Sequence, residues 1–329
     1  LDALSQAMAT KQRGGIVICQ VMRLARGGGI NQLFVQIPGI LVDYVVLVDM
    51  AKEPQLHMQT FLEQYCPYYS GQVQFPEDSL FKPMEMSIRK IIARRSMVEL
   101  LPLGNCTVNL GIGMPEGVAN VAREENLRDR MTLTVESGPI GGLPASGLSF
   151  GASYSPSAVL PQPSQFDFYD GGGLDIAFLG AGEVDEEGNV NVSKFGPKFA
   201  GCGGFINITQ NARRVVFCTT FTADGLKTEQ QDGRIKIISE GKTAKFVKKV
   251  EQITFSGRYA LEKGTEVTYV TERGVFRLEK DGLRLIEIAP GIDLQTEILD
   301  QMQFKPVISG SPRLINPAIF INQPMNLQG

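Results

Sequence analysis

The sequence predicts an α/β fold, and three observations support that prediction. Short apolar runs of strand length lie between turn residues, as in Leu41–Val48 (LVDYVVLV) and Leu174–Gly180 (LDIAFLG). Segments with helical spacing of apolar residues alternate with these runs. The stretch Thr107–Val135 has the order strand, helix, strand, which joins parallel strands of one sheet. Continuous apolar runs are typical of strands covered on both faces, so we expect open α/β sheets.

Composition limits the classes of partner. The 329 residues are 43% hydrophobic, enough for two domains with full cores. The formal net charge is -3, and the 32 basic and 35 acidic residues are mixed along the chain. This distribution argues against nucleic acid or an anionic membrane as a partner. No apolar run approaches the roughly 20 residues of a membrane span.

Cysteine and histidine usage limits the chemistry. His57 is the only histidine. The five cysteines are far apart in the sequence and include no CxxC pair; they are Cys19, Cys66, Cys106, Cys202 and Cys218. We therefore expect no metal site and no disulfide framework. A reducing compartment is favoured, namely the cytoplasm, with the mitochondrial matrix as the alternative. A catalytic Ser-His-Asp or Cys-His arrangement would have to use His57, which lies in a polar, aromatic stretch. We do not favour such a mechanism.

The first part of the chain predicts a helix and two strands. Leu1–Gln12 has no early basic region of the kind found in a signal or transit peptide, and it is typical of a helix entered in mid-domain. We expect that sequence upstream is missing. Ile16–Val21 and Leu41–Val48 are predicted to be strands, the first of them buried. Asp49–Pro83 is rich in Pro, Gln and Tyr, which predicts a long connection and a boundary near residue 85.

The second part opens with a helix and a compact strand–helix–strand unit. Ser87 is a good N-cap for an amphipathic helix to Leu100, with basic residues between its apolar positions. The unit that follows has strands at Thr107–Ile112 and Met131–Val135, with the helix Val118–Leu127 between them. This unit ends on the segment TLTVESGPIGG, which contains Glu136.

Glu136 is placed for chemistry by its position in the chain. It follows a β-branched run and precedes Ser137, Gly138 and Pro139, which continue neither a strand nor a helix. Carboxyl ends of strands border the ligand crevice in open α/β sheets. Gly141 and Gly142 would let the backbone approach a ligand closely. A surface turn glutamate is an equally good interpretation of this stretch alone.

Two glycine clusters are candidate ligand loops. Gly111, Gly113 and Gly117 could cradle a phosphate or a pantetheine amide, although a tight strand-to-helix turn is the better interpretation. Gly201–Ile208 (GCGGFINI) is expected to place glycines before a short strand, where a bulge or tight packing is the alternative. Cys202 within it is more typical of a packed thiol than of a nucleophile.

The remainder predicts further sheet. Residues 138–173 are expected to be irregular with one short helix, and 304–329 to wrap the surface. A helix is predicted at Leu294–Met302. A hairpin is predicted at Glu183–Asn191, and strands at Leu174–Gly180, Arg214–Thr219, Ile235–Ile238, Ala244–Val250, Gln252–Phe255, Val267–Thr271, Val275–Glu279 and Leu283–Ile288.

From Leu1 to about Phe304 the sequence resembles the family I CoA-transferases, most closely their single-chain acetate or propionate type. The motifs that carry the resemblance are IPGILVDYVV, NLGIGMPEGVA, LTVESGPIGG, SQFDFYDGGGLDIAFLG, GNVNVSKFG, CGGFINI, KVEQITFSG, YVTERGVF and IEIAPGIDL. The pattern VESG, where the succinate/3-oxoacid branch has SENG, favours the acetate/propionate branch. The resemblance implies two open α/β sheet domains of the CoA-transferase (sugar-phosphate-isomerase-like) type. Residues 1–85 would be the C-terminal part of the first domain plus the connection, and 86–329 the second domain.

The resemblance also implies roles for individual residues. Glu136 would attack the acyl-CoA carbonyl, forming a mixed anhydride and then a glutamyl-CoA thioester. The backbone N–H of Gly204, with Gly203 beside it, would serve the oxyanion hole. Asn109 and Asn191 would lie near CoA, as would the turn at Gly111 and Gly113. Coenzyme A and acyl-CoA would be substrates, with no permanently bound cofactor.

The resemblance also predicts the partners of the protein, and two alternative functions stay open. The resemblance implies short-chain acyl-CoA and a carboxylate (acetate, propionate, butyrate or acetoacetate) as small-molecule partners, and a homo-oligomer. It also implies a missing N-terminal region or a companion chain, which would supply the second oxyanion donor. An acyl-CoA hydrolase that uses the same intermediate and a non-catalytic ligand-binding fragment are the alternatives.

Overall fold

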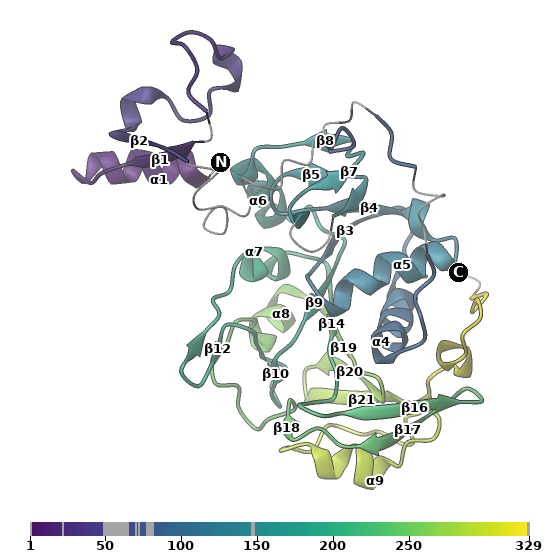
Figure 1. Ribbon diagram of the computed structural model, residues 1–329. Coiled ribbons are helices and arrows are strands. Elements are labelled where there is room, and N and C mark those ends of the chain that lie inside the picture. The colour runs from purple at the N-terminus through teal and green to yellow at the C-terminus, as the bar shows by residue number, and fades with distance from the viewer. Residues whose placement is uncertain are drawn as a thin grey trace. The chain divides into compact units, whose positions relative to one another are not determined.

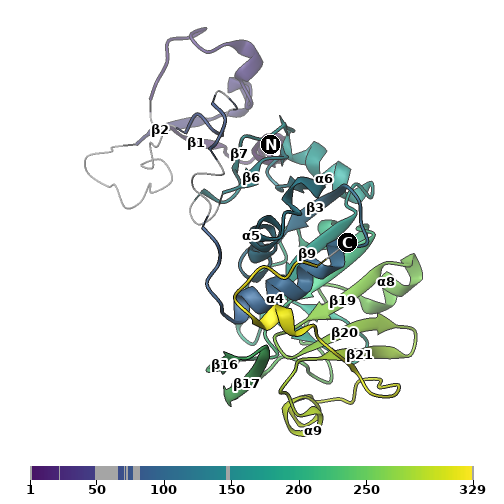
Figure 2. The same ribbon diagram turned by 90° about the vertical axis from the view of Figure 1, so that its right-hand side faces the viewer.

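The computed structural model describes residues 2–21, 23–48, 66–69, 71, 73–76, 82–145 and 149–327 (Figures 1 and 2). The chain divides into two compact units. The first contains residues Leu1–Phe75 and Glu136–Gln165, and the second contains Pro76–Val135 and Phe166–Gly329. His57 and most of the expected connection lie outside the described residues. The predicted family-domain boundary at residue 85 stays a prediction.

The second unit is built on a mixed sheet, which confirms the predicted α/β class. Its strand order is β22-β21-β20-β19-β14-β9-β3-β4. The stretch from β19 to β4 is parallel, β19, β20 and β21 form an antiparallel meander, and β22 is parallel to β21. The bounds are β3 Cys106–Leu110, β4 Met131–Thr134, β9 Ile176–Gly180, β14 Arg214–Cys218, β19 Glu266–Val270, β20 Gly274–Glu279, β21 Gly282–Ile288 and β22 Arg313–Leu314.

Helices cover both faces of this sheet. Figure 1 shows α4 (Ile88–Met97) and α5 (Gly117–Glu124) on one side, and α7 (Phe205–Gln210) and α8 (Gly257–Lys263) on the other. Ile176 and Phe178 of β9 belong to one core cluster, whereas Ala177 and Leu179 belong to the other. Successive side chains of a strand point to opposite faces, so a strand with two covered faces is apolar throughout. This is why LDIAFLG was recognisable as a strand.

The helix predicted from Ser87 forms, but three of its four basic side chains are not exposed. The Ser87 side chain accepts a hydrogen bond from the backbone N–H of Lys90, as an N-cap does. Lys90, Arg94 and Arg95 are nevertheless only 1–4% exposed. They form ion pairs and hydrogen bonds with groups from α5, β21 and the C-terminal tail. The expectation of an amphipathic helix was therefore wrong.

Other expectations are also corrected. Gly201–Ile208 leads into the helix α7 and not into a strand. Neither of the strands expected at 244–250 and 252–255 forms; β18 (Thr243–Ala244) overlaps the first of them at one residue and pairs with β15 (Thr222–Ala223). The hairpin of β16 (Lys227–Gln231) and β17 (Arg234–Ser239) includes a strand too polar to be predicted. The helix expected at 294–302 is the single turn α9 (Leu294–Glu297) followed by a 3-10 turn.

The C-terminal tail is part of the core and not a surface strap. Its buried side chains pack in the cluster that contains α4 and α5; they are Ile315, Ile319, Phe320 and Met325. The remaining small pairs of this unit are β10 (Glu183–Val184) with β11 (Val190–Asn191), as predicted for the hairpin, and β12 (Lys194–Phe195) with β13 (Lys198–Phe199).

The first unit contains α1 (Asp2–Gln12) and a two-stranded parallel pair, β1 (Ile18–Val21) with β2 (Tyr44–Leu47). Both strands were predicted, but neither β1 nor β2 is buried. The segment after Glu136 forms short antiparallel pairs, β5 (Pro139–Ile140) with β8 (Ala158–Val159) and β6 (Leu143–Pro144) with β7 (Ser153–Tyr154). The predicted short helix is α6 (Gln162–Asp170), which begins in this unit and ends in the second. In the part of the chain that is described, no helix has the length and hydropathy to cross a membrane.

Candidate active site

Glu136 lies where the sequence predicted it, just beyond the end of a strand. β4 ends at Thr134, Val135 is buried, and Glu136 is the partly exposed first residue of a turn. β4 lies beside β3, in parallel register with Asn109 opposite Thr134. The carboxylate therefore follows the carboxyl end of a parallel strand, which is the edge where open α/β sheets bind ligands.

The glycines after Glu136 are required by the packing of the first unit itself. Gly138 has φ +128°, and a Cβ there would lie 1.9 Å from the carbonyl oxygen of Leu160. Gly142 has φ +68°, and a Cβ there would lie 2.1 Å from the carbonyl oxygen of Tyr154. Both values are far below any real contact. At these glycines the close approach is to the chain's own backbone, which explains them without a ligand.

Asn109 is a buried polar residue on the strand next to β4. It is 2% exposed, and its Nδ2 donates to the carbonyl oxygen of Thr134 and to the hydroxyl of Tyr169, each at 3.4 Å. The Tyr169 hydroxyl donates to Thr134 Oγ1 at 3.1 Å. Asn109 Oδ1 has no hydrogen-bond partner among the described residues. Tyr169 was not predicted from the sequence, because a tyrosine in an aromatic-rich segment gives no signal of a polar role.

The turn after β3 uses its glycine amides internally. The N–H of Gly111 donates to the carbonyl oxygen of Phe178, and the N–H of Gly113 donates to Glu116 Oε1. Gly113 has φ +86°, a conformation that favours glycine. In this conformation neither N–H is available to a ligand. The geometry is that of a tight strand-to-helix turn, and the CoA-binding role of Gly111 and Gly113 stays a prediction.

Gly203 and Gly204 lie at the start of α7. Gly203 has φ +54°, and a Cβ there would have no atom within 4 Å, so open space lies beside its backbone. Gly204 is the N-cap residue of α7, and the neighbouring Cys202 is exposed and not packed as expected. Both glycines, Asn109 and Asn191 belong to the second unit, whereas Glu136 belongs to the first.

The Asn191 amide is fully used by hydrogen bonds to its own hairpin and to the segment that follows it. Nδ2 donates to Glu183 Oε2 at 2.7 Å and to the carbonyl oxygen of Lys194 at 2.6 Å. Oδ1 accepts from the backbone N–H groups of Ser193 and Lys194. The side chain connects the hairpin to the segment after it, and its role near CoA stays a prediction.

A charged cluster lies just beyond the carboxyl ends of β9, β14 and β19. Lys245 Nζ donates to the carbonyl oxygen of Ala181 and to Thr219 Oγ1, and burial lowers the pKa of Lys245 to about 8. Nearby, Arg273 is fully buried and pairs with Glu272 and Glu240 at 2.7 Å each. Residue type alone did not reveal this cluster.

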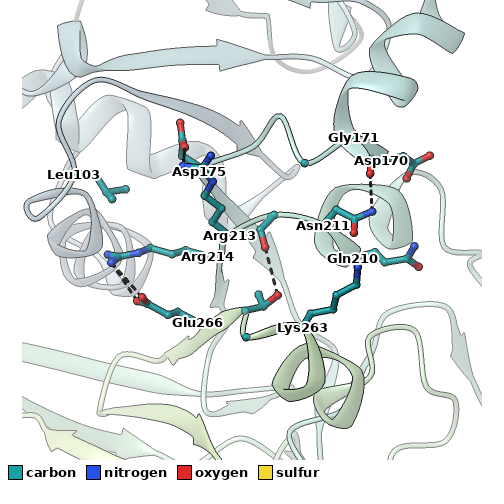
Figure 3. A pocket seen from close by; sticks show the side chains of 14 residues that line it. Leu103, Asp170, Gly171, Asp175, Gln210, Asn211, Arg213, Arg214, Lys263 and Glu266 are labelled. Carbon is teal, nitrogen blue, oxygen red and sulfur yellow. Dashed lines mark hydrogen bonds and ion pairs between the residues drawn. The ribbon is translucent and has the colours of Figure 1, made fainter.

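The opposite edge of the sheet has a hollow of about 520 Å³ (Figure 3). It lies at the amino ends of β9, β14 and β19, and none of the predicted site residues lines it. Its charges are largely paired: Arg213 with Asp175 and Arg214 with Glu266, each at 3.2 Å. Amino ends of parallel strands are not the usual ligand edge. The described residues contain no group of three or more His, Cys, Asp or Glu side chains that could hold a metal ion.

Comparison with known proteins identifies the family. No protein-family model matches the chain. It is 45% identical over 328 residues to the acetate CoA-transferase YdiF of Escherichia coli K12, covering 99% of this chain and 60% of YdiF. It is 31% identical over 221 residues to the beta subunit of acetate CoA-transferase from the same organism, covering 64% of this chain and 90% of the subunit. The chain belongs to the family I CoA-transferases.

Further CoA-transferases agree with this assignment. The caffeate CoA-transferase of Acetobacterium woodii is 44% identical over 324 residues, covering 97% of this chain and 60% of that protein. The acyl-CoA transferase YdiF of E. coli O157:H7, solved as a thioester complex with CoA, superposes with a TM-score of 0.83 at 43% identity, covering 99% of this chain and 60% of that one. The glutaconate CoA-transferase of Acidaminococcus fermentans shares the fold, with a TM-score of 0.52 at 19% identity over 71% of this chain and 92% of that one.

Two facts follow from these comparisons. The chain spans about 60% of the length of YdiF and of the caffeate CoA-transferase. The relatives named here are bacterial, so they give no support to the mitochondrial alternative.

Proposed function

We propose that this CoA-transferase chain is part of an enzyme that moves CoA between a short-chain acyl-CoA and a carboxylic acid, with Glu136 as the nucleophile. The observation that carries the proposal is Glu136 just beyond the end of β4, in a chain 45% identical to an acetate CoA-transferase. A purely ligand-binding chain would have no need of a carboxylate at that position. The thioester complex with CoA in the related YdiF supports a covalent route.

The proposed reaction needs only the substrates and this carboxylate. An oxygen of Glu136 attacks the thioester carbonyl of acyl-CoA, and CoA leaves as the thiolate. The thiolate then attacks the γ-carbonyl of Glu136 in the mixed anhydride, which releases the first acid and forms the glutamyl-CoA thioester. A second acid reverses both steps. The N–H of Gly204, beside Gly203, is proposed to stabilise the oxyanion in each addition.

The acid is proposed to be short: acetate, propionate, butyrate or acetoacetate. Related chains act on acetate and on caffeate at similar identity, 45% and 44%. The acyl group must therefore be determined by experiment, with acetate and caffeate in the same panel of acceptors. CoA enters this scheme as a substrate, and no permanently bound cofactor is proposed.

The enzyme is also proposed to need a further α/β part, as a preceding region or as a companion chain. β1 and β2 support this, because Ile18 and Tyr44–Leu47 are 48–63% exposed in a parallel pair. Parallel strands are stable when both faces are covered, and a two-stranded pair is at best marginal alone. A homo-oligomer and a cytoplasmic location remain predictions.

The test is to trap the intermediate. The protein, with any companion chain, is incubated with acetyl-CoA, treated with borohydride or hydroxylamine, and mapped by peptide mass spectrometry. We expect modification at Glu136 that disappears in Glu136→Gln and persists in the control Glu262→Gln, an exposed residue of α8. Modification elsewhere, or none in the assembled enzyme, would refute the mechanism. CoA release that needs no acceptor acid would indicate a hydrolase.

A further inference from the structure

A chain of buried hydrogen bonds connects the carboxyl ends of β3 and β4. Thr134 Oγ1 donates to the carbonyl oxygen of Val108 at 3.1 Å, and the Tyr169 hydroxyl donates to Thr134 Oγ1 at 3.1 Å. Asn109 Nδ2 then donates to the Tyr169 hydroxyl and to the carbonyl oxygen of Thr134. Asn109, Thr134 and Tyr169 are 0–2% exposed. The network ends two residues before Glu136.

The direction of every bond in this network is fixed by its two carbonyl groups. A carbonyl oxygen only accepts, so Thr134 must donate its proton to Val108. Thr134 Oγ1 is then the acceptor for the Tyr169 proton, and the Tyr169 oxygen is left to accept from Asn109. The carbonyl of Thr134 takes the other Nδ2 proton. Both Nδ2 protons are therefore used, and the carboxamide cannot turn over without losing them.

This fixed orientation leaves one group unsatisfied. Asn109 Oδ1 is buried, accepts no hydrogen bond from the described residues, and cannot exchange places with Nδ2. A buried acceptor without a donor is costly, and such groups in native proteins call for an explanation. A ligand that brings an N–H group to Asn109 Oδ1 would remove the cost. The pantetheine arm of CoA carries amide N–H groups.

We propose that Tyr169 is a positioning residue, which orients Asn109 so that Oδ1 accepts a hydrogen bond from an amide N–H of the CoA pantetheine arm. The inference rests on the proposed function, because it takes CoA as the ligand. Tyr169 touches no substrate itself. Thr134 contributes to the same positioning. Its hydroxyl oxygen accepts the Tyr169 proton, which is then not donated to Asn109 Oδ1.

Calorimetric titration of the protein, with any companion chain, tests the proposal with two ligands. CoA has the pantetheine arm, and adenosine 3′,5′-bisphosphate is its nucleotide part without the arm. In Tyr169→Phe we expect CoA to bind about 3- to 10-fold more weakly, the loss of one ordinary hydrogen bond, with the bisphosphate unchanged. Thr134→Val should weaken CoA binding at least as much, because the Tyr169 proton is then free to occupy Asn109 Oδ1.

Two controls separate positioning from structural damage. Tyr269→Phe removes another fully buried hydroxyl of the same unit, one that donates to the carbonyl of Gly188, and it should leave CoA binding unchanged. In a double-mutant cycle, Asn109→Ala with Tyr169→Phe should bind CoA as weakly as Asn109→Ala alone, because Tyr169 acts through Asn109.

Several results would overturn the inference. One is that the losses of CoA affinity in Asn109→Ala and Tyr169→Phe add up in the double variant. Another is that Tyr169→Phe weakens the binding of CoA and of the bisphosphate equally. The last two are an unchanged CoA affinity in Tyr169→Phe, or no CoA binding by the unmodified protein. Labelling of Glu136 by acetyl-CoA is measured in parallel and reports on the proposed function alone. A labelled Glu136 with an unaffected Tyr169→Phe would thus refute the positioning role and leave the transferase intact.

Discussion

The helix α4 and the strand β2 have burial opposite to what their residue types suggest. α4 (IRKIIARRSM) carries four basic side chains, three of which are 1–4% exposed. β2 (YVVL) is wholly apolar or aromatic, yet its residues are 48–61% exposed. Hydrophobic side chains are usually the buried ones, and lysine and arginine are almost never buried unless paired. The contrast shows that burial depends on what the rest of the chain supplies to each element.

The buried basic side chains of α4 bind carboxylates and backbone carbonyl groups from other elements. Lys90 Nζ lies 2.7 Å from Glu124 of α5 and donates to the carbonyl of Met84. Arg95 Nε lies 2.6 Å from Glu287 of β21. Arg94 donates to backbone carbonyls of the C-terminal tail, including that of Gln323. These bonds attach the tail to α4. Among the described residues β2 pairs only with β1, so its apolar faces stay exposed.

The largest effect that tests this contrast is expected from Glu124→Gln. The change leaves Lys90 with a buried charge that no carboxylate neutralises, and breaking a buried pair typically costs about 3–5 kcal/mol. Glutamine keeps the shape and an acceptor for the N–H of Met84. Urea unfolding of the two proteins gives the difference in the free energy of unfolding.

Glu116→Gln is the matched control for that measurement. Glu116 pairs with Arg89 of the same helix at 2.9 Å, but the two side chains are 31% and 44% exposed. Exposed pairs contribute about 0–1 kcal/mol, so this variant should lose little. If both variants lost the same stability, burial of the α4 charges would not be what makes their partners important.

A smaller effect, dependent on pH, is expected from Lys245. Burial lowers its pKa from 10.5 to about 8. The unfolded chain therefore binds this proton more tightly between about pH 8 and 10.5, and stability gains from Lys245 as the pH rises through that window. Below about pH 8 Lys245 is charged in both the folded and the unfolded state. The full cost of burying this charge then lowers the free energy of unfolding, by at most about 3 kcal/mol from the size of the pKa shift.

Lys245→Met removes that dependence and measures it. Thr219 Oγ1 still donates to the carbonyl of Ala181 in the variant, so the change does not leave that hydroxyl without a partner. We expect Lys245→Met to gain stability relative to the unmodified protein at pH 7, and the difference to shrink towards pH 10. A difference that stays constant from pH 7 to 10 would show that the pKa of Lys245 is not lowered.

Patterns within short segments predicted much of the fold. The strand β9 and the β3–α5–β4 unit were found because each signal lies within one segment: a continuous apolar run, or a strand followed by a helical period. The helix α7 was missed, since Gly203 and Gly204 before a short apolar stretch favour a strand and a helix cap equally. The polar strand β16 was missed because none of its side chains is apolar enough to show a buried face.

The candidate site was likewise predictable only where its signal lies within one segment. The position of Glu136 followed from local sequence, because the strand and the residues that end it are adjacent. The Asn109–Tyr169–Thr134 network could not be predicted, since it joins three segments separated by up to 60 residues. The basic residues of α4 were assigned to an exposed face for the same reason: Glu124 and Glu287, which neutralise them, come from other elements.

The smallest effect is expected from Val46→Ala, and it returns to the exposed strand β2. Val46 is 48% exposed, so removing two methyl groups should change the free energy of unfolding by no more than about 0.5 kcal/mol. The same change at Val215, fully buried in the parallel strand β14, should cost about 2 kcal/mol from lost burial and the cavity. If a further α/β part covers β2 in the assembled enzyme, Val46→Ala should cost more there than in this chain alone, whereas Val215→Ala should cost the same in both. Equal costs for Val46→Ala with and without that part would mean that β2 is not the surface it covers.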